Sequence, residues 1–92
     1  MPYIEAHRRG PLDAGDKPRT PGELHYVLTT LVAEYLGPHA RYSGLNEAIG
    51  VLECVKQELY RRILAPYEDR KRVENGEVYG AILHAPITKT GE

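Results

Sequence analysis

The stretch that decides the fold is residues 42–79, YSGLNEAIGVLECVKQELYRRILAPYEDRKRVENGEVY. Its first part carries apolar residues at the three- and four-residue spacing of an amphipathic helix. Pro66 disfavours helical backbone at Ala65, and an Asn75-Gly76 pair is typical of a helix end. We therefore predict a long helix over 44–64, capped by Ser43, then a bend and a short helix over 66–74.

A further helix is predicted before this stretch, over 21–36. Thr20 is a suitable N-cap, Pro21 suits the first helical position, and Gly37-Pro38 ends the run. Both long helices carry an apolar stripe. The stripe of the second consists of Leu45, Ala48, Ile49, Leu52, Val55, Leu59 and Ile63.

These elements predict an all-α fold, in which 21–36 and 44–64 form an antiparallel helical hairpin and 66–74 adds a short third helix. The two stripes would face each other while little covers their far sides, so we expect oligomerisation to complete a helical bundle. Glycines and prolines crowd residues 10–22, which predicts an irregular arm over 1–22. The helical domain would occupy 23–80, followed by a weakly ordered tail over 81–92.

Composition narrows the possible functions. A chain of 92 residues makes one small domain with a marginal core, and the single cysteine, Cys54, excludes an intrachain disulfide, so self-association is expected. The net charge of −1 argues against a general polyanion binder. No apolar stretch is long enough for a membrane span and no secretory leader is recognisable, which favours the cytoplasm of a bacterial cell.

Lys56 is the most informative single residue, because helical spacing places it inside the apolar arc of the second helix. Glu53 and Tyr60 lie on the same flank, three residues before and four residues after it. Lys56 can cover the stripe with its stem and pair with Glu53. Alternatively, it is a cation in a pocket for an anionic ligand at a helix or subunit interface, or a catalytic lysine.

Basic residues are concentrated over 61–72, which contain five basic and two acidic side chains, with Tyr60 and Tyr67 at the edges. Guanidinium groups beside aromatic rings suit nucleotide phosphates and bases, although such a run can also be a solvated helix face. The predicted ligand-binding residues are Glu53, Lys56, Tyr60, Arg61, Arg62, Tyr67, Arg70 and Arg72.

Catalytic and metal chemistry find little support in the sequence. His7, His25, His39 and His84 lie on different segments without paired spacing, so neither a metal nor a cofactor is predicted. The start Met1-Pro2 is similar to that of the tautomerase family, where the exposed proline amine is the reactive group, and Arg8 and Arg9 would then hold a carboxylate. The predicted helices do not match the β-α-β unit of that family.

The chain resembles a small family of uncharacterised proteins carried by bacteriophages and environmental bacteria. The resemblance rests on the start of the chain, on a helix like residues 24–36, and on a nearly continuous block: Asn46-Glu47, Gly50-Val51-Leu52-Glu53-Cys54, Lys56, Glu58, Tyr60-Arg61-Arg62, Ala65-Pro66-Tyr67-Glu68-Asp69 and Glu74-Asn75-Gly76. The arm over 10–20 and the tail after Gly80 depart from the family pattern. The family has no assigned activity, so the resemblance implies no catalytic residues.

The resulting expectation is a small, non-catalytic phage-type binding protein that sequesters a phosphorylated small molecule, such as a nucleotide immune signal, and so counters host defence. A protein–protein adaptor or inhibitor of a host enzyme is the alternative. A nucleic-acid accessory factor is a further alternative, but the net charge of −1 argues against binding to a polyanion.

Overall fold

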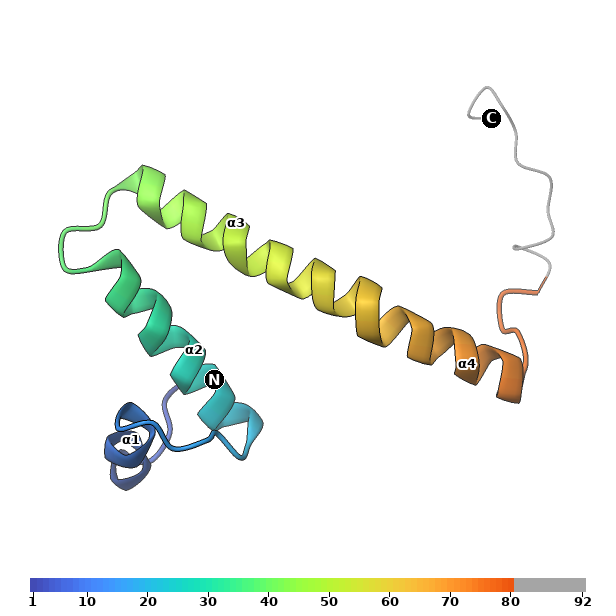
Figure 1. Ribbon diagram of the computed structural model, residues 1–92, viewed down its shortest axis with the longest axis horizontal. Helices are drawn as coiled ribbons and strands as arrows, with labels where there is room; N and C mark the ends of the chain where they lie inside the picture. The colour runs from blue at the N-terminus through green and yellow to red at the C-terminus, as the bar shows by residue number, and fades with distance from the viewer. Residues whose placement is uncertain (81–92) are drawn as a thin grey trace. The chain divides into compact units, whose positions relative to one another are not determined.

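The computed structural model describes residues 1–80, and every regular element in that range is helical (Figure 1). The elements are α1 (Ala6–Asp13), α2 (Pro21–Leu36), α3 (Tyr42–Leu59), a π-helical turn η1 (Tyr60–Leu64) and α4 (Ala65–Asn75). The all-α class predicted from the sequence is confirmed. The predicted tail over 81–92 lies outside the described residues.

The chain divides into two units within α3: an N-terminal unit, Met1–Leu52, and a C-terminal unit that begins at Glu53. In the N-terminal unit, α2 has the bounds that the sequence predicted. Thr20 is extended, and its hydroxyl oxygen accepts a hydrogen bond from the Glu23 backbone N–H at 3.1 Å. Pro21 begins the helix, and Gly37, at φ 76°, ends it.

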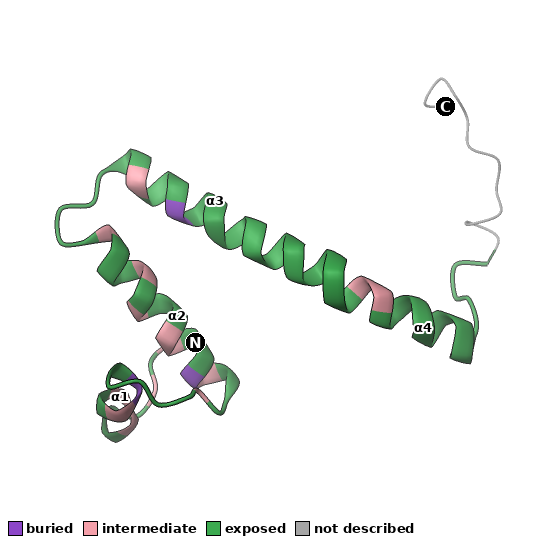
Figure 2. Cartoon of the chain, in the orientation of Figure 1, coloured by how far each residue is buried: buried purple, intermediate pink, exposed green. Residues whose placement is uncertain are grey.

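Helix α1 corrects the prediction of an irregular arm over 1–22. Its sequence contains Gly10 and Pro11, which disfavour a helix taken alone, but α1 docks against α2. Leu12 is 5% exposed and is one of two buried apolar residues in the described part of the chain, the other being Ala48 (Figure 2). Tertiary contact therefore outweighs local propensity here.

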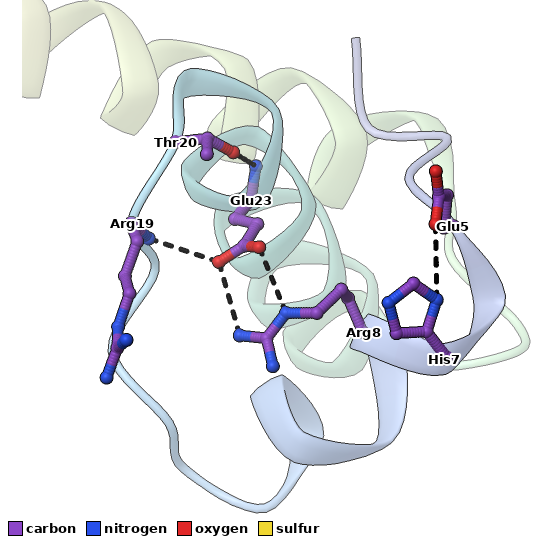
Figure 3. A network of polar contacts seen from close by, with 6 residues as sticks. All are labelled: Glu5, His7, Arg8, Arg19, Thr20 and Glu23. Carbon is purple, nitrogen blue, oxygen red and sulfur yellow. Dashed lines mark hydrogen bonds and ion pairs between the residues drawn. The ribbon is translucent and has the colours of Figure 1, made fainter.

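Polar contacts centred on Glu23 join α1 to the start of α2 (Figure 3). Arg8 of α1 donates through Nε to one Glu23 carboxylate oxygen at 3.1 Å and through a terminal nitrogen to the other at 3.4 Å. The Arg19 backbone N–H donates to the same carboxylate at 3.1 Å. The Tyr26 hydroxyl adds a hydrogen bond to Asp13 at 2.8 Å. Two side-chain pairs, 15 and 13 residues apart in the sequence, therefore hold α1 against α2.

The N-terminal residues also approach the first turn of α2. A Cβ added to Gly22 would lie 3.4 Å from the Ile4 side chain and 3.7 Å from the Met1 carbonyl oxygen. Arg9 donates to the Ile4 carbonyl oxygen at 3.0 Å and lies over the Tyr26 ring. Gly22 thus leaves room for Met1 and Ile4 beside the first turn of α2, and Arg9 binds the Ile4 carbonyl oxygen.

Helix α3 begins two residues earlier than predicted. The Leu45 N–H donates to the Arg41 carbonyl oxygen at 3.0 Å, so Ser43 lies inside the first turn instead of capping it. The described helix pairs that contact each other are α1 with α2, and η1 with α4. The hairpin packing of α2 on α3 and its completion by oligomerisation therefore stay predictions.

The predicted bend before Pro66 is wrong. Leu64 and Ala65 both have helical backbone angles, and the helical path continues through them into α4. Pro66 has no N–H and its ring crowds the carbonyl of the preceding turn. The chain accommodates it by widening that turn: the Ala65 N–H donates to the Tyr60 carbonyl oxygen, five residues earlier. The helix ends at Asn75, one residue after the predicted end, with Gly76 at φ 99°.

Candidate functional site

All eight predicted ligand-binding residues lie in the C-terminal unit, along the end of α3, η1 and α4. Their basic side chains are mostly paired with carboxylates of the same unit. Lys56 Nζ lies 3.4 Å from Glu53, and both Arg61 and Arg62 contact Glu58. This contact agrees with the first interpretation of Lys56 given above, in which Lys56 pairs with Glu53.

Helix α4 repeats this pattern. Arg72 lies 3.8 Å from Asp69 and 3.7 Å from Glu77, and Lys71 lies 3.1 Å from Glu74. Arg70 has no ion-pair partner among residues 1–80 and lies over the Tyr67 ring instead. Residues 53–80 carry six acidic and six basic side chains. A phosphate would therefore compete with neighbouring carboxylates for most of these cations.

The pKa shifts reflect these local contacts. A hydrogen bond from Gln57, followed by the charge of Lys56, lowers the pKa of the Glu53 carboxyl below its ordinary value. The negative charge of Glu68, whose carboxylate accepts a hydrogen bond from the Tyr60 hydroxyl at 3.3 Å, raises the pKa of Tyr60. Both shifts favour the forms that these contacts stabilise, the ionised carboxylate of Glu53 and the protonated hydroxyl of Tyr60.

The wide turn of η1 determines which side chains share a face. Leu59 and Tyr67 are eight residues apart, which is about 80° around an uninterrupted α-helix. A π-helical turn holds about one extra residue and brings the two close to one side. The hydrogen bond from Tyr60 to Glu68, also eight residues apart, shows the same alignment. Pro66 and η1 thus keep Tyr67 of α4 on the side of the C-terminal unit that carries Leu59.

An open groove follows this side of the C-terminal unit. Six of its lining residues form what we call the 56–67 face: Lys56, Leu59, Tyr60, Ile63, Leu64 and Tyr67. The groove continues over Arg61 and Arg70, so it brings together five of the predicted residues and leaves out Glu53, Arg62 and Arg72. Leu59, Ile63 and Leu64 were not predicted as site residues, although Leu59 and Ile63 belong to the predicted apolar stripe.

Five of the six residues of the 56–67 face have large apolar side chains, and all six residues are exposed; Figure 2 draws most of this segment in the colour of exposed residues. Leu59 is 60% exposed and Ile63 63%, and Leu64 and Tyr67 are also exposed. Single exposed apolar side chains are normal on a protein surface, but a contiguous row of them marks a site of association. The face has the aromatic and aliphatic composition of an interface core, with Lys56 at one end.

Other candidate sites have no support in the described residues. Residues 1–80 contain no cluster of three potential metal ligands. Arg8 is engaged by Glu23 and Arg9 by the Ile4 carbonyl oxygen, so the two arginines that a tautomerase would use are held by structural contacts. No helix in the same range is long and apolar enough to cross a membrane.

Comparison with known families identifies the chain at the level of a family. Residues 1–78 match the family described as "Domain of unknown function (DUF6899)", and the chain belongs to that family. The match includes α1 as well as residues 42–78 of the stretch on which the sequence resemblance mainly rests. No curated protein and no solved structure matches the chain.

Proposed function

We propose that this chain is a non-catalytic binding protein that recognises a polypeptide through the 56–67 face. The observation that carries the proposal is the exposure of five large apolar side chains on one side of the C-terminal unit. A helical partner that lies along the groove would remove these side chains from water, at about 25 cal/mol for each Å² of apolar surface.

The charge distribution supports a polypeptide over a phosphorylated ligand. The ion pairs around the groove are local and exposed, as expected for the polar rim of a protein interface. The predicted hairpin and self-association fit the same proposal, since the described part of the chain buries only Leu12 and Ala48 as apolar residues. A chain with so small a core gains stability from association.

A photo-cross-linking experiment tests the proposal. A photoreactive amino acid replaces Leu59 on the face or Val73 on α4, which is 79% exposed and does not line the groove. We expect Leu59 to yield an adduct with a polypeptide in host cells, while Val73 yields none. Absence of an adduct at Leu59, or equal labelling at both positions, would contradict the proposal.

A phosphorylated small molecule, such as a nucleotide immune signal, is a second candidate ligand. The contact that favours it is Arg70 over the Tyr67 ring at 5.8 Å, because a guanidinium without a carboxylate partner in the described residues is available to a phosphate. A thermal-shift screen against cyclic dinucleotides and ADP-ribose derivatives tests this candidate with Arg70→Ala as the control. A shift that survives in Arg70→Ala contradicts it.

A further inference from the structure

We infer that the polypeptide bound by the 56–67 face is a second copy of this chain, paired antiparallel about a two-fold axis at η1. The inference rests on the proposed function, because it identifies the partner of the same face. Its basis is a two-fold pattern in the residues of the 56–67 face, together with Glu53 and Arg70 beyond its two ends, which a copy of the chain running in the opposite direction satisfies.

The face is self-complementary, because residues at equal distances on either side of its midpoint suit each other as contact partners. Its midpoint lies between Arg61 and Arg62, within η1. In an antiparallel pair with this midpoint on the axis, Leu59 lies level with Leu64 of the second copy, and Tyr60 lies level with Ile63 of the second copy. Both combinations place exposed apolar side chains against each other.

Charge supports the same arrangement outside this apolar centre. Lys56 lies level with Tyr67 of the second copy, and Glu53 lies level with Arg70 of the second copy. A lysine beside a tyrosine ring and an acid at the level of a base are both favourable. Parallel, in-register pairing would instead place Lys56 beside Lys56, Glu53 beside Glu53 and Arg70 beside Arg70. A charged residue in an apolar seam thus selects the orientation, as polar seam residues do in coiled coils.

The two arginines at the midpoint do not oppose this pairing. Arg61 and Arg62 both pair with Glu58 of their own chain. Both side chains are largely exposed, Arg61 at 71% and Arg62 at 68%, so each guanidinium group stays in water beside a carboxylate of its own chain. A closed two-fold pair also uses the same surface on both copies and leaves no further copy of the face exposed.

Sedimentation of the full chain over a series of concentrations gives the first test. We expect a monomer–dimer equilibrium, and we expect Leu59→Glu to raise the dissociation constant at least about 100-fold, because the two-fold axis repeats each substitution. Val73→Glu, the same change at a more exposed position off the face, should leave the constant unchanged. Circular dichroism of each variant at equal concentration shows whether helix is retained.

Disulfide trapping gives the orientation without a destabilising charge. In a Cys54→Ser background, chains carrying Leu59→Cys are mixed with chains carrying Leu64→Cys under mild oxidation. Antiparallel pairing predicts that the mixed disulfide predominates, because the two positions are level. Predominant pairing of Leu59→Cys with itself indicates parallel helices and overturns the inference.

The outcomes also separate this inference from the proposed function. A monomer at every concentration, together with a photoadduct from Leu59 to a different polypeptide, overturns the self-pairing and leaves the proposed function intact. A monomer without any photoadduct overturns both.

Discussion

Glu23 is the side chain on which the docking of α1 depends. Its carboxylate accepts hydrogen bonds from Arg8 and from the Arg19 N–H, and these contacts lower the pKa of Glu23, with the Arg8 hydrogen bond as the largest cause. A group whose pKa is lowered by folding stabilises the folded state above its unfolded pKa. That contribution is lost as the pH falls through the pKa of the folded state.

Because folding lowers the pKa of Glu23, we expect acid to release α1 from α2. The thermal midpoint of the wild-type chain should decrease when the pH is lowered from neutral to well below 4.5, the ordinary pKa of a glutamate. In Glu23→Gln the midpoint at neutral pH should be lower and the fall with acid smaller, because the carboxyl that titrates has been removed. Hydrogen exchange locates the effect in residues 6–13. Equal pH dependence in the two proteins would contradict this role of Glu23.

Thr20 carries a second prediction at the scale of one residue. Its hydroxyl oxygen accepts the Glu23 N–H, which has no partner inside α2. Thr20→Ala should lower the free energy of unfolding by about 1 kcal/mol, as loss of an N-cap does. Urea unfolding followed by circular dichroism measures the change. Thr20→Ser keeps the hydroxyl and should restore most of the stability, and a Ser variant as unstable as the Ala variant would argue against the cap.

Among the elements, η1 decides how the C-terminal unit presents its side chains. A wider turn before Pro66 keeps α4 helical, where a sharp bend would have separated Tyr67 from Leu59. The cost is a turn of poorer hydrogen-bond geometry, which persists because an α-helical turn would bring the Pro66 ring against a carbonyl.

Replacement of the proline tests this cause. In Pro66→Ala the turn should relax to an α-helix, and the Ala65 N–H should then donate to the Arg61 carbonyl oxygen in place of Tyr60. Helix stability should rise by up to about 3 kcal/mol, the difference in helix propensity between the two residues. NMR chemical shifts and amide exchange over 60–66 report the change. Pro18→Ala, in the loop before α2, controls for the effect of a lost proline on the unfolded chain.

Relaxation of η1 should also weaken association despite the gain in helix stability. Loss of the wide turn rotates Tyr67 by about 90° relative to Leu59, which divides the 56–67 face. The expected result is a more stable helix with a weaker dimer, measured by sedimentation of the same variant. Unchanged association would show that the alignment of these two residues does not matter.

At the scale of the whole molecule, the small core predicts a stability that depends on concentration. If a second copy covers the 56–67 face, the thermal midpoint should rise by several degrees for each tenfold increase in chain concentration. Leu59→Glu should remove most of this dependence, while Val73→Glu should keep it. A midpoint that is independent of concentration in the wild-type chain would contradict association of the folded state.

Much of the molecule was predictable where the signals are local. The bounds of α2 follow from Thr20, Pro21 and Gly37, and the end of α4 follows from Asn75-Gly76. Helix α1 was missed because Gly10 and Pro11 argue against a helix, whereas its stabilising contact, Arg8 with Glu23, joins residues far apart in sequence.

The candidate site can be predicted only in part, because the sequence shows which side chains are charged but not which carboxylate each cation contacts. The basic run over 61–72 was recognised, but Glu58, which holds both Arg61 and Arg62, lies just before it. The bend at Pro66 was predicted from the usual effect of a proline. Whether the chain ends the helix at Pro66 or continues it through a π-helical turn depends on the stability of the helix on both sides, and no single residue indicates which alternative is adopted.

The extra residue that η1 absorbs has an evolutionary consequence. A relative of this chain that lacks one residue between positions 60 and 64 could keep Leu59 and Tyr67 on the same side with an ordinary α-helical turn. An alignment of such a relative would then show a one-residue gap inside a helix, where gaps are normally penalised. The position of that gap would mark η1 as an inserted residue retained within the helix, and the loss of Pro66 should accompany it.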